Sequence, residues 1–256
     1  MRGTRAPAER RSGVTGPRYP RAVNRGRLHA PLPSGRSAVV PADVAPAIDP
    51  DAVFERLALD DTSWIDIARG WLLGADDVYA HLVENVAWRQ GRVWRYERWI
   101  DEPRLGAGAS VTNPGHPVLA HAQRAIASKY RARFDGFGLA YYRNARDSVA
   151  MHRDREMRWL DDTIVGIVTF GATRPFLVKR RSTVDRSTAR DLAPASGDLM
   201  VFGGRFQADW LHGVPKTRHA VRGRISAQWR YTSKRGRRDT QPGYYEPREF
   251  SRRSSR

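Results

Sequence analysis

The chain has 256 residues, of which 40% are hydrophobic, and carries 45 Lys and Arg against 27 Asp and Glu, a net charge of +18. It contains no cysteine, which excludes disulfides, thiolate catalysis and cysteine-bound zinc or iron–sulfur sites, so any metal must bind to His, Asp, Glu or water. The longest apolar stretch, around TIVGIVTFGA, is too short to span a membrane, and no hydrophobic region follows the basic N-terminus, so we expect a soluble cytoplasmic protein with no membrane partner.

Charge is concentrated towards the two ends of the chain. Residues 1–36 hold nine Arg and one Glu, a net +8, and residues 234–256 hold eight Lys or Arg and three acids, a net +5, which leaves +5 for the rest. Basic tails favour polyanions, so nucleic acid is the expected partner. A coding bias towards Arg or a wrongly assigned start would give the same composition, so the tails alone do not decide the function.

Two helices are predicted after a long polar segment. Residues 1–47 are rich in Pro, Gly, Ser and Arg and lack apolar periodicity, which predicts a disordered arm. The segment ADDVYAHLVENVAW (75–88) opens with acids suited to a helix N-terminus and spaces its apolar residues four apart. The segment HPVLAHAQRAIASKYRARF (116–134) has Pro117 near its first turn and an apolar face.

From Phe137 onward the pattern changes to short β-branched and aromatic runs separated by turn residues. The runs are FGLAYYR, SVAMH, TIVGIVTFG, RPFLVK, GDLMVFGG, ADWLHGV and RISAQWRY, and VWRYERWI (93–100) is expected to form an eighth strand. So many short strands predict a closed or double-sheet all-β unit, such as a sandwich or jelly roll, flanked by the two helices. Residues 233–256 are expected to be a basic, flexible tail, and nothing in the sequence indicates an oligomer, so we expect a monomer.

The stretch SVAMHRDREM (148–157) places His152 and Asp154 one residue apart. Alternate residues of a strand face the same way, so an imidazole and a carboxylate at this spacing converge on one point. Such a pair is usually a surface charge pair or a local hydrogen bond. With a second histidine, however, it forms the facial triad of non-heme Fe(II) oxygenases, which leaves coordination positions open for a cosubstrate and O2.

The third corner of such a triad has to be one of the other histidines. Four of them lie in the predicted arm or on or beside the predicted helices: His29, His81, His116 and His121. Of the remaining two, His219 lies in an apparent loop, whereas His212 directly follows the strand ADWL and precedes Gly213. We therefore select His212.

The last predicted strand, GRISAQWRY, carries Arg224 and Arg230. They are six residues apart, so both side chains point to the same face of the strand. A guanidinium grips a carboxylate with two parallel bonds, which suits a dicarboxylate cosubstrate. An inward-facing Arg is costly unless it is paired, and the alternative is an edge strand with both arginines in solvent.

Together these residues resemble the AlkB family of Fe(II)- and 2-oxoglutarate-dependent dioxygenases. The resemblance runs from about Trp88 to Tyr231 and rests on AYYRNARDSVAMHRDRE, IVTFGATRPFLVKRR, SGDLMVFGGRFQADWLHGVP and the positions of the two arginines after His212. It implies a double-stranded β-helix, or jelly roll, with N-terminal helices. It also implies a dioxygenase domain over residues 48–232, with its jelly-roll core at about 137–231.

The resemblance also implies the roles of individual residues. The iron ligands would be His152, Asp154 and His212. For the cosubstrate, Arg230 would pair with the distal carboxylate of 2-oxoglutarate, Arg224 would lie near its other end, and Tyr142 would hydrogen-bond it. Glu156 stands where the repair members carry an acid that contacts the damaged base; a solvated loop acid is the alternative.

The activity implied is oxidative dealkylation of N-alkylated bases in DNA or RNA, using Fe(II), 2-oxoglutarate and O2 and releasing formaldehyde, succinate and CO2. Two positions depart from the family pattern, because Ser226 and Ala140 stand where an Asn is frequent. The upstream segment resembles the substrate-gripping lid of the family only loosely, through EPR (102–104). Two alternatives stay open: a hydroxylase or demethylase that acts on a protein or small molecule, and a non-catalytic nucleic-acid-binding module with a vestigial site.

Overall fold

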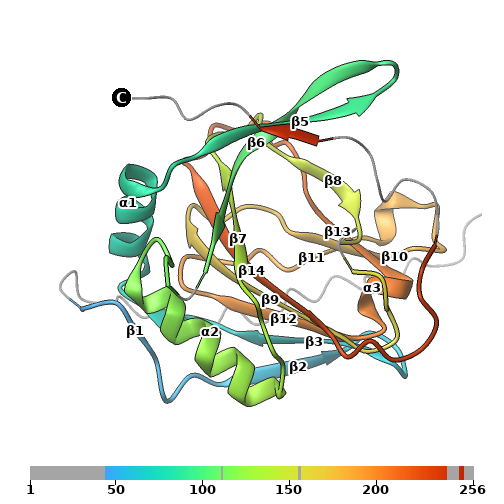
Figure 1. Cartoon of the computed structure of the whole chain (residues 1–256), viewed down its shortest axis with the longest axis horizontal. Coiled ribbons are helices and arrows are strands. Elements are labelled where there is room, and N and C mark those ends of the chain that lie inside the picture. Colours follow the sequence, from blue (N-terminus) through green and yellow to red (C-terminus); the bar gives the residue numbers. More distant parts are fainter. Residues whose placement is uncertain (1–43, 111, 155–156, 241–247, 251–256) are drawn as a thin grey trace, which may run out of the picture. The chain divides into compact units, whose positions relative to one another are not determined.

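The computed structural model describes residues 44–110, 112–154, 157–240 and 248–250 (Figure 1). Its helices are α1 (Ala75–Asn85), α2 (Pro117–Tyr130) and the short α3 (Phe206–Asp209), with a 3-10 turn at Arg186–Thr188. The strands before α2 are β1 (Ala47–Ile48), β2 (Phe54–Ala58), β3 (Ser63–Ala68), β4 (Leu72–Leu73), β5 (Arg89–Arg95) and β6 (Arg98–Ala109). Those after it are β7 (Phe137–Tyr142), β8 (Val149–His152), β9 (Thr163–Gly171), β10 (Leu177–Arg180), β11 (Arg190–Asp191), β12 (Leu199–Gly204), β13 (Trp210–Val214), β14 (Arg224–Thr232) and β15 (Arg248–Phe250).

Two antiparallel sheets form the jelly roll. The larger sheet has the strand order β15-β5-β6-β7-β14-β9-β12-β3-β2, and the smaller has the order β11-β10-β13-β8. The prediction of an all-β core with flanking helices is therefore confirmed. No helix in the described ranges is long and apolar enough to cross a membrane.

The larger sheet is covered on both faces, and strand β9 shows why. All but the last of its residues are buried, and they alternate between two hydrophobic clusters. Ile164 and Val168 belong to the cluster that contains the apolar residues of α1 and α2, whereas Val165 and Ile167 belong to the one that fills the space between the two sheets. The alternation follows from the period of two in a strand, and it leaves the inter-sheet layer to hold a site.

The sequence VWRYERWI, predicted as one strand, is a hairpin in the structure. Strand β5 ends at Arg95 and β6 begins at Arg98, and the two turn residues Tyr96 and Glu97 have φ angles of 52° and 59°. A two-residue hairpin turn with positive φ at both positions usually contains Asn-Gly or Asp-Gly, which is absent here. The sequence therefore contains no recognisable signal for this hairpin turn. Strands β2 and β3 were likewise not predicted from the sequence.

The N-terminal arm and the C-terminal tail, both predicted to be irregular, contain described residues that form backbone pairs with other segments. Most of the N-terminal arm, residues 1–43, lies outside the described residues, but Ala47 pairs with Leu73. In the C-terminal tail, the backbone N–H of Asp239 donates to the carbonyl of Arg158 at 2.6 Å. Further along, β15 pairs with β5. Two parts of the tail thus contact the jelly roll, at the segment after β8 and at the hairpin.

Trp229 is the largest fully buried side chain and packs between the sheet and α2. Its ring lies 4.9 Å from that of Phe137, and its indole N–H donates to Gln123 Oε1 of α2 at 3.1 Å. We expect Trp229→Ala to lower the free energy of unfolding by about 3–5 kcal/mol, because it leaves a large cavity and an unpaired amide. Urea unfolding measures this change. Val184→Ala, at a side chain that is 93% exposed, is the control and should stay within about 0.5 kcal/mol of the parent chain.

Candidate metal centre and cosubstrate site

Two neighbouring strands of the smaller sheet bring the predicted ligand residues together. His152 is the last residue of β8 and pairs in register with His212 of β13, and Asp154 follows two residues beyond the strand end. One potential ligand atom from each residue lies within 4.8 Å of the other two. Nε2 of each histidine is 3.8 Å from Asp154 Oδ1. The pairing of β8 with β13, which the sequence does not reveal, thus brings together ligand residues that are sixty positions apart in the chain.

The electrostatics of the cluster suit a divalent cation. Burial lowers the pKa of His212 to about 3, so its imidazole is neutral and keeps a lone pair at physiological pH. Burial also lowers the pKa of His152. Burial alone would raise the pKa of Asp154, but the nearby Arg230, His212 and His152 outweigh it and hold this pKa well below its usual range. Two neutral imidazoles and one carboxylate are the donor set that Fe(II) prefers in oxygenases.

The surroundings of the cluster orient its side chains. His152 Nδ1 lies 2.8 Å from the carbonyl of Ala150, so its N–H donates there and Nε2 is left as the lone-pair nitrogen. Gln207 of α3, fully buried, accepts a 2.8 Å hydrogen bond from the Asp154 backbone N–H and donates to Asp154 Oδ2 at 3.4 Å. Sequence reasoning missed Gln207, because nothing in its neighbourhood marks it before the fold brings it to Asp154.

The two arginines of β14 lie at different ends of the site. Arg230 contacts Asp154, with Nε 3.0 Å from Oδ2 and Nη2 3.2 Å from Oδ1, and its Nη2 also donates to Gln228 Oε1 at 2.5 Å. Arg230 therefore lies at the metal end. The sequence-based expectation pairs Arg230 with the distal carboxylate of 2-oxoglutarate, and this stays a prediction; in the structure the guanidinium contacts Asp154 and Gln228, beside the ligand cluster.

Arg224 is fully buried, and none of its three guanidinium nitrogens has a hydrogen-bond partner in the described part of the chain. The rings of Tyr142 and Phe176 lie 5.9 Å and 5.6 Å from its Cζ. Burial lowers its pKa to about 10, so it is still cationic at neutral pH. An uncompensated buried cation is costly, and its five N–H donors match a carboxylate.

Tyr142 lies next to Arg224 and is also hydrogen-bonded to Arg104. It is 1% exposed, lies opposite Arg224 in the β7–β14 register, and its hydroxyl accepts a 3.3 Å hydrogen bond from Arg104 of β6. Arg104 is the arginine of the EPR segment, for which the loose resemblance to the family's lid predicts no role in the cosubstrate site. The two departures from the family pattern, Ser226 and Ala140, are direct cross-strand partners, so one small patch of the sheet carries both.

A cavity of about 430 Å³ surrounds the ligand cluster. It is lined by His152, Asp154, His212, Tyr142 and Arg230, and by residues of the β5–β6 hairpin that include Tyr96. Glu156, predicted to contact the base, lies outside the described residues. The remaining predicted site residues occur in or against one inter-sheet space, with the ligand cluster near Arg230 and the unpaired cation at the other end of β14.

Comparisons with known proteins find similar oxygenases. The model of the 2OG-Fe(II) oxygenase superfamily matches residues 115–241. Alpha-ketoglutarate-dependent dioxygenase alkB homolog 3 is 31% identical in Bos taurus and 30% in Homo sapiens, in each case over 63% of this chain and 64% of the relative. The human DNA oxidative demethylase ALKBH2 is 23% identical over 61% of this chain and 68% of that protein.

The fold has a solved counterpart as well. The prolyl hydroxylase from Trichoplax adhaerens, solved with a hypoxia-inducible-factor peptide, shares 11% identity and a TM-score of 0.51 over 66% of this chain and 84% of that one. This likeness concerns the fold alone. The chain spans 64% of the length of the alkB homolog 3 relatives. The superfamily match, the matches to alkB homologues and the His152–Asp154–His212 cluster make the chain similar to the AlkB family of 2-oxoglutarate- and Fe(II)-dependent oxygenases.

Proposed function

We propose that this chain is a dioxygenase that dealkylates N-alkylated bases in DNA or RNA, with release of formaldehyde, succinate and CO2. The observation that carries the proposal is the His-Asp-His cluster, two of whose three members are buried, together with the buried Arg224 guanidinium, which has no hydrogen-bond partner among the described residues and lies against Tyr142 and Phe176 of the cavity lining. Bound Fe(II) and 2-oxoglutarate would supply the activation of O2 for attack on the carbon attached to the base nitrogen. The relatives named as DNA oxidative demethylases support the choice of substrate.

Within this proposal His152, Asp154 and His212 hold the metal. Gln207 keeps the Asp154 carboxylate oriented, and the Ala150 carbonyl keeps the His152 tautomer that leaves Nε2 free. Arg230 supplies positive charge beside Asp154 and would face the end of 2-oxoglutarate nearest the metal ligands. Arg224 binds the distal carboxylate and Tyr142 hydrogen-bonds the cosubstrate, which gives the otherwise uncompensated buried cation its counter-ion.

The β5–β6 hairpin supports a nucleic-acid substrate. Trp94 is 42% exposed and Tyr96 is 85% exposed, although large aromatic side chains are usually buried. The guanidinium of Arg92 lies 5.6 Å from the Trp99 ring on the same hairpin. Exposed aromatics interleaved with Arg bind single-stranded nucleic acid by stacking and charge. Because Tyr96 also lines the metal cavity, a strand held by the hairpin would present its flipped base to the cluster.

Removal of one metal ligand tests the centre. His212→Ala should abolish binding of Co(II), used as an air-stable stand-in for Fe(II), because two ligands cannot form the facial set. The visible absorption of the Co(II) complex in an anaerobic titration measures the loss. His219→Ala, at an exposed residue of the connecting loop, should titrate like the parent chain. A His212→Ala chain with unchanged Co(II) affinity would contradict the assignment.

We expect the buried charge of Arg224 to lower the stability of the folded chain and to strengthen the binding of the cosubstrate. Its pKa is depressed on folding, so at any pH below about 10 the buried charge weakens the folded state. We expect Arg224→Met to raise the urea midpoint of the ligand-free chain at pH 7. The same variant should lose the stabilisation by Mn(II) and 2-oxoglutarate, which for the parent chain is about 2.7 kcal/mol at a hundred times Kd. Arg124→Met, on the exposed face of α2, is the matched control. A variant destabilised without ligand, yet still stabilised by 2-oxoglutarate, would refute this role.

The activity itself has a direct test. The purified chain with Fe(II), 2-oxoglutarate and O2 should release formaldehyde from an oligonucleotide that contains 1-methyladenine or 3-methylcytosine, and His152→Ala should release none. Succinate formation that needs another compound, with no turnover of any methylated oligonucleotide, would point to a protein or small-molecule substrate. Equal oligonucleotide binding by the parent chain and His152→Ala, without turnover by either, would point to a non-catalytic binding module.

A further inference from the structure

After β14 the chain continues along the segment that follows the ligand strand β8. The Ser233 backbone N–H donates to the carbonyl of Asp162 at 3.2 Å. Further on, Arg238 forms an antiparallel bridge with Trp159, and its guanidinium carbon lies 5.5 Å from the centre of the Trp159 ring. The C-terminal segment, residues 233–240, therefore lies antiparallel to the segment after β8 and contacts it through backbone and side chains.

Asp239 contacts this segment through both its backbone and its charge. Its N–H donates to the Arg158 carbonyl at 2.6 Å, and its own carbonyl accepts a 3.0 Å hydrogen bond from Arg158 Nη1. Its carboxylate forms an ion pair with the guanidinium of Arg153. The side chains of Asp239 and Arg153 are only 12% and 17% exposed, so water and salt screen this pair much less than a surface ion pair.

Arg153 lies between two of the metal ligands in the sequence. It directly follows His152 and precedes Asp154, and it lines the metal cavity of about 430 Å³. Asp154 lies beyond the end of β8, so strand pairing does not fix its backbone. The position of the Asp154 backbone therefore depends on contacts made by single residues, among them the hydrogen bond from its N–H to Gln207.

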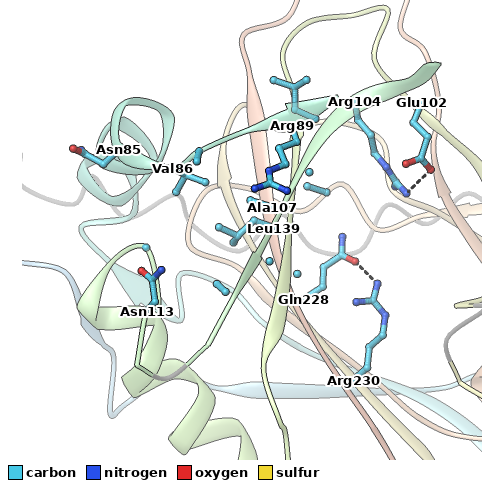
Figure 2. Close-up of a pocket in the computed structure, with 18 residues that line it drawn as sticks. Asn85, Val86, Arg89, Glu102, Arg104, Ala107, Asn113, Leu139, Gln228 and Arg230 are labelled. Atoms are coloured by element: carbon cyan, nitrogen blue, oxygen red, sulfur yellow. Dashed lines mark hydrogen bonds and ion pairs between the residues drawn. The ribbon is translucent and has the colours of Figure 1, made fainter. Parts of the chain in front are cut away.

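The side chain of Asp154 has its own set of contacts. Arg230 Nε lies 3.0 Å from Asp154 Oδ2, and Figure 2 shows the Arg230 guanidinium beside Gln228, whose Oε1 accepts from Nη2 at 2.5 Å. These contacts orient the carboxylate. The Asp239–Arg153 ion pair acts one residue earlier, on the backbone that joins the first two ligands.

The ion pair also changes the charge around the cluster. Besides the ligand residues, the lining of the metal cavity contains three arginines: Arg104, Arg153 and Arg230. Positive charge near the cluster opposes the binding of a divalent cation, and the opposition is stronger where water is excluded. The Asp239 carboxylate compensates part of this charge at Arg153. Its loss would loosen the ligand segment and add one net positive charge beside the cavity.

We propose that Asp239 is a positioning residue of the metal centre, which acts through its ion pair with Arg153 to fix the backbone between the first two ligands. The inference rests on the metal centre of the proposed function and adds to it a residue 86 positions after Arg153. Loss of groups that orient metal ligands in this indirect way typically weakens metal binding about 10–100-fold. The C-terminal segment is thus part of the metal centre.

Asp239→Asn tests the proposal, because it removes the charge and keeps the shape of the side chain. Anaerobic titration with Co(II), followed by visible absorption, should give a Kd about 10-fold above that of the parent chain. Asp239→Glu, which keeps the carboxylate, should recover most of this affinity. Asp66→Asn is the control: Asp66 is paired with Arg56 and accepts from Tyr130 of α2. It should lower the urea midpoint and leave the Co(II) Kd unchanged.

A second background shows whether the effect passes through Arg153. In a chain that already carries Arg153→Gln, Asp239→Asn should change the Co(II) Kd little, because both substitutions remove the same interaction. An equal loss of affinity in both backgrounds would overturn the proposal. So would an Asp239→Asn chain that loses stability as Asp66→Asn does but binds Co(II) like the parent chain, and the metal centre would then stand. A parent chain that binds no Co(II) would overturn the metal centre itself and this inference with it.

Discussion

The charge of one buried carboxylate organises the functional part of this molecule. Asp154 is 3% exposed, and an anion so far from water persists only if neighbouring groups compensate it. Arg230 supplies a guanidinium, Gln207 hydrogen-bonds both the backbone and the side chain, and two neutral imidazoles lie 3.8 Å away. Those contacts come from β14, α3, β8 and β13, so the position of the carboxylate depends on both sheets at once. The cluster is consequently a property of the assembled jelly roll rather than of the His-x-Asp segment.

Arg224 presents the opposite electrostatic situation at the other end of the same strand. Its guanidinium is as deeply buried as Asp154 but, apart from the rings of Tyr142 and Phe176, has no hydrogen-bond partner among the described residues. The protein therefore carries an unneutralised cation inside its core, held in place by the nine-residue strand β14 between β7 and β9. Such an arrangement lowers the stability of the ligand-free chain and raises the affinity for an anion of the right shape. Binding of a dicarboxylate would then relieve a cost that folding has already incurred.

The residues of the site and the hydrophobic core that packs on the helices lie on opposite faces of the larger sheet. The outer face of the larger sheet packs on α1 and α2, and this cluster contains Trp229, Phe137 and Val168. The inner face carries Tyr142, Ser226 and Gln228, which line the space between the sheets. Because neighbouring residues of a strand point to opposite faces, β7 and β14 serve both functions at once. Residues that stabilise the fold and residues that form the site alternate along the same segments.

The sequence by itself was enough for the class of fold, the two helices, most strands after Phe137 and the residue types of the metal cluster, because these depend on local periodicity and on a small set of histidines. It also indicated that Arg224 and Arg230 share a face, since parity along a strand is a local property. Only the tertiary structure decided which end of the site each arginine occupies, that Gln207 and Arg104 belong to it, and that Tyr96 and Glu97 form a hairpin turn. The physical reason is that strand neighbours and their register are set by contacts between distant segments, which a linear pattern does not contain.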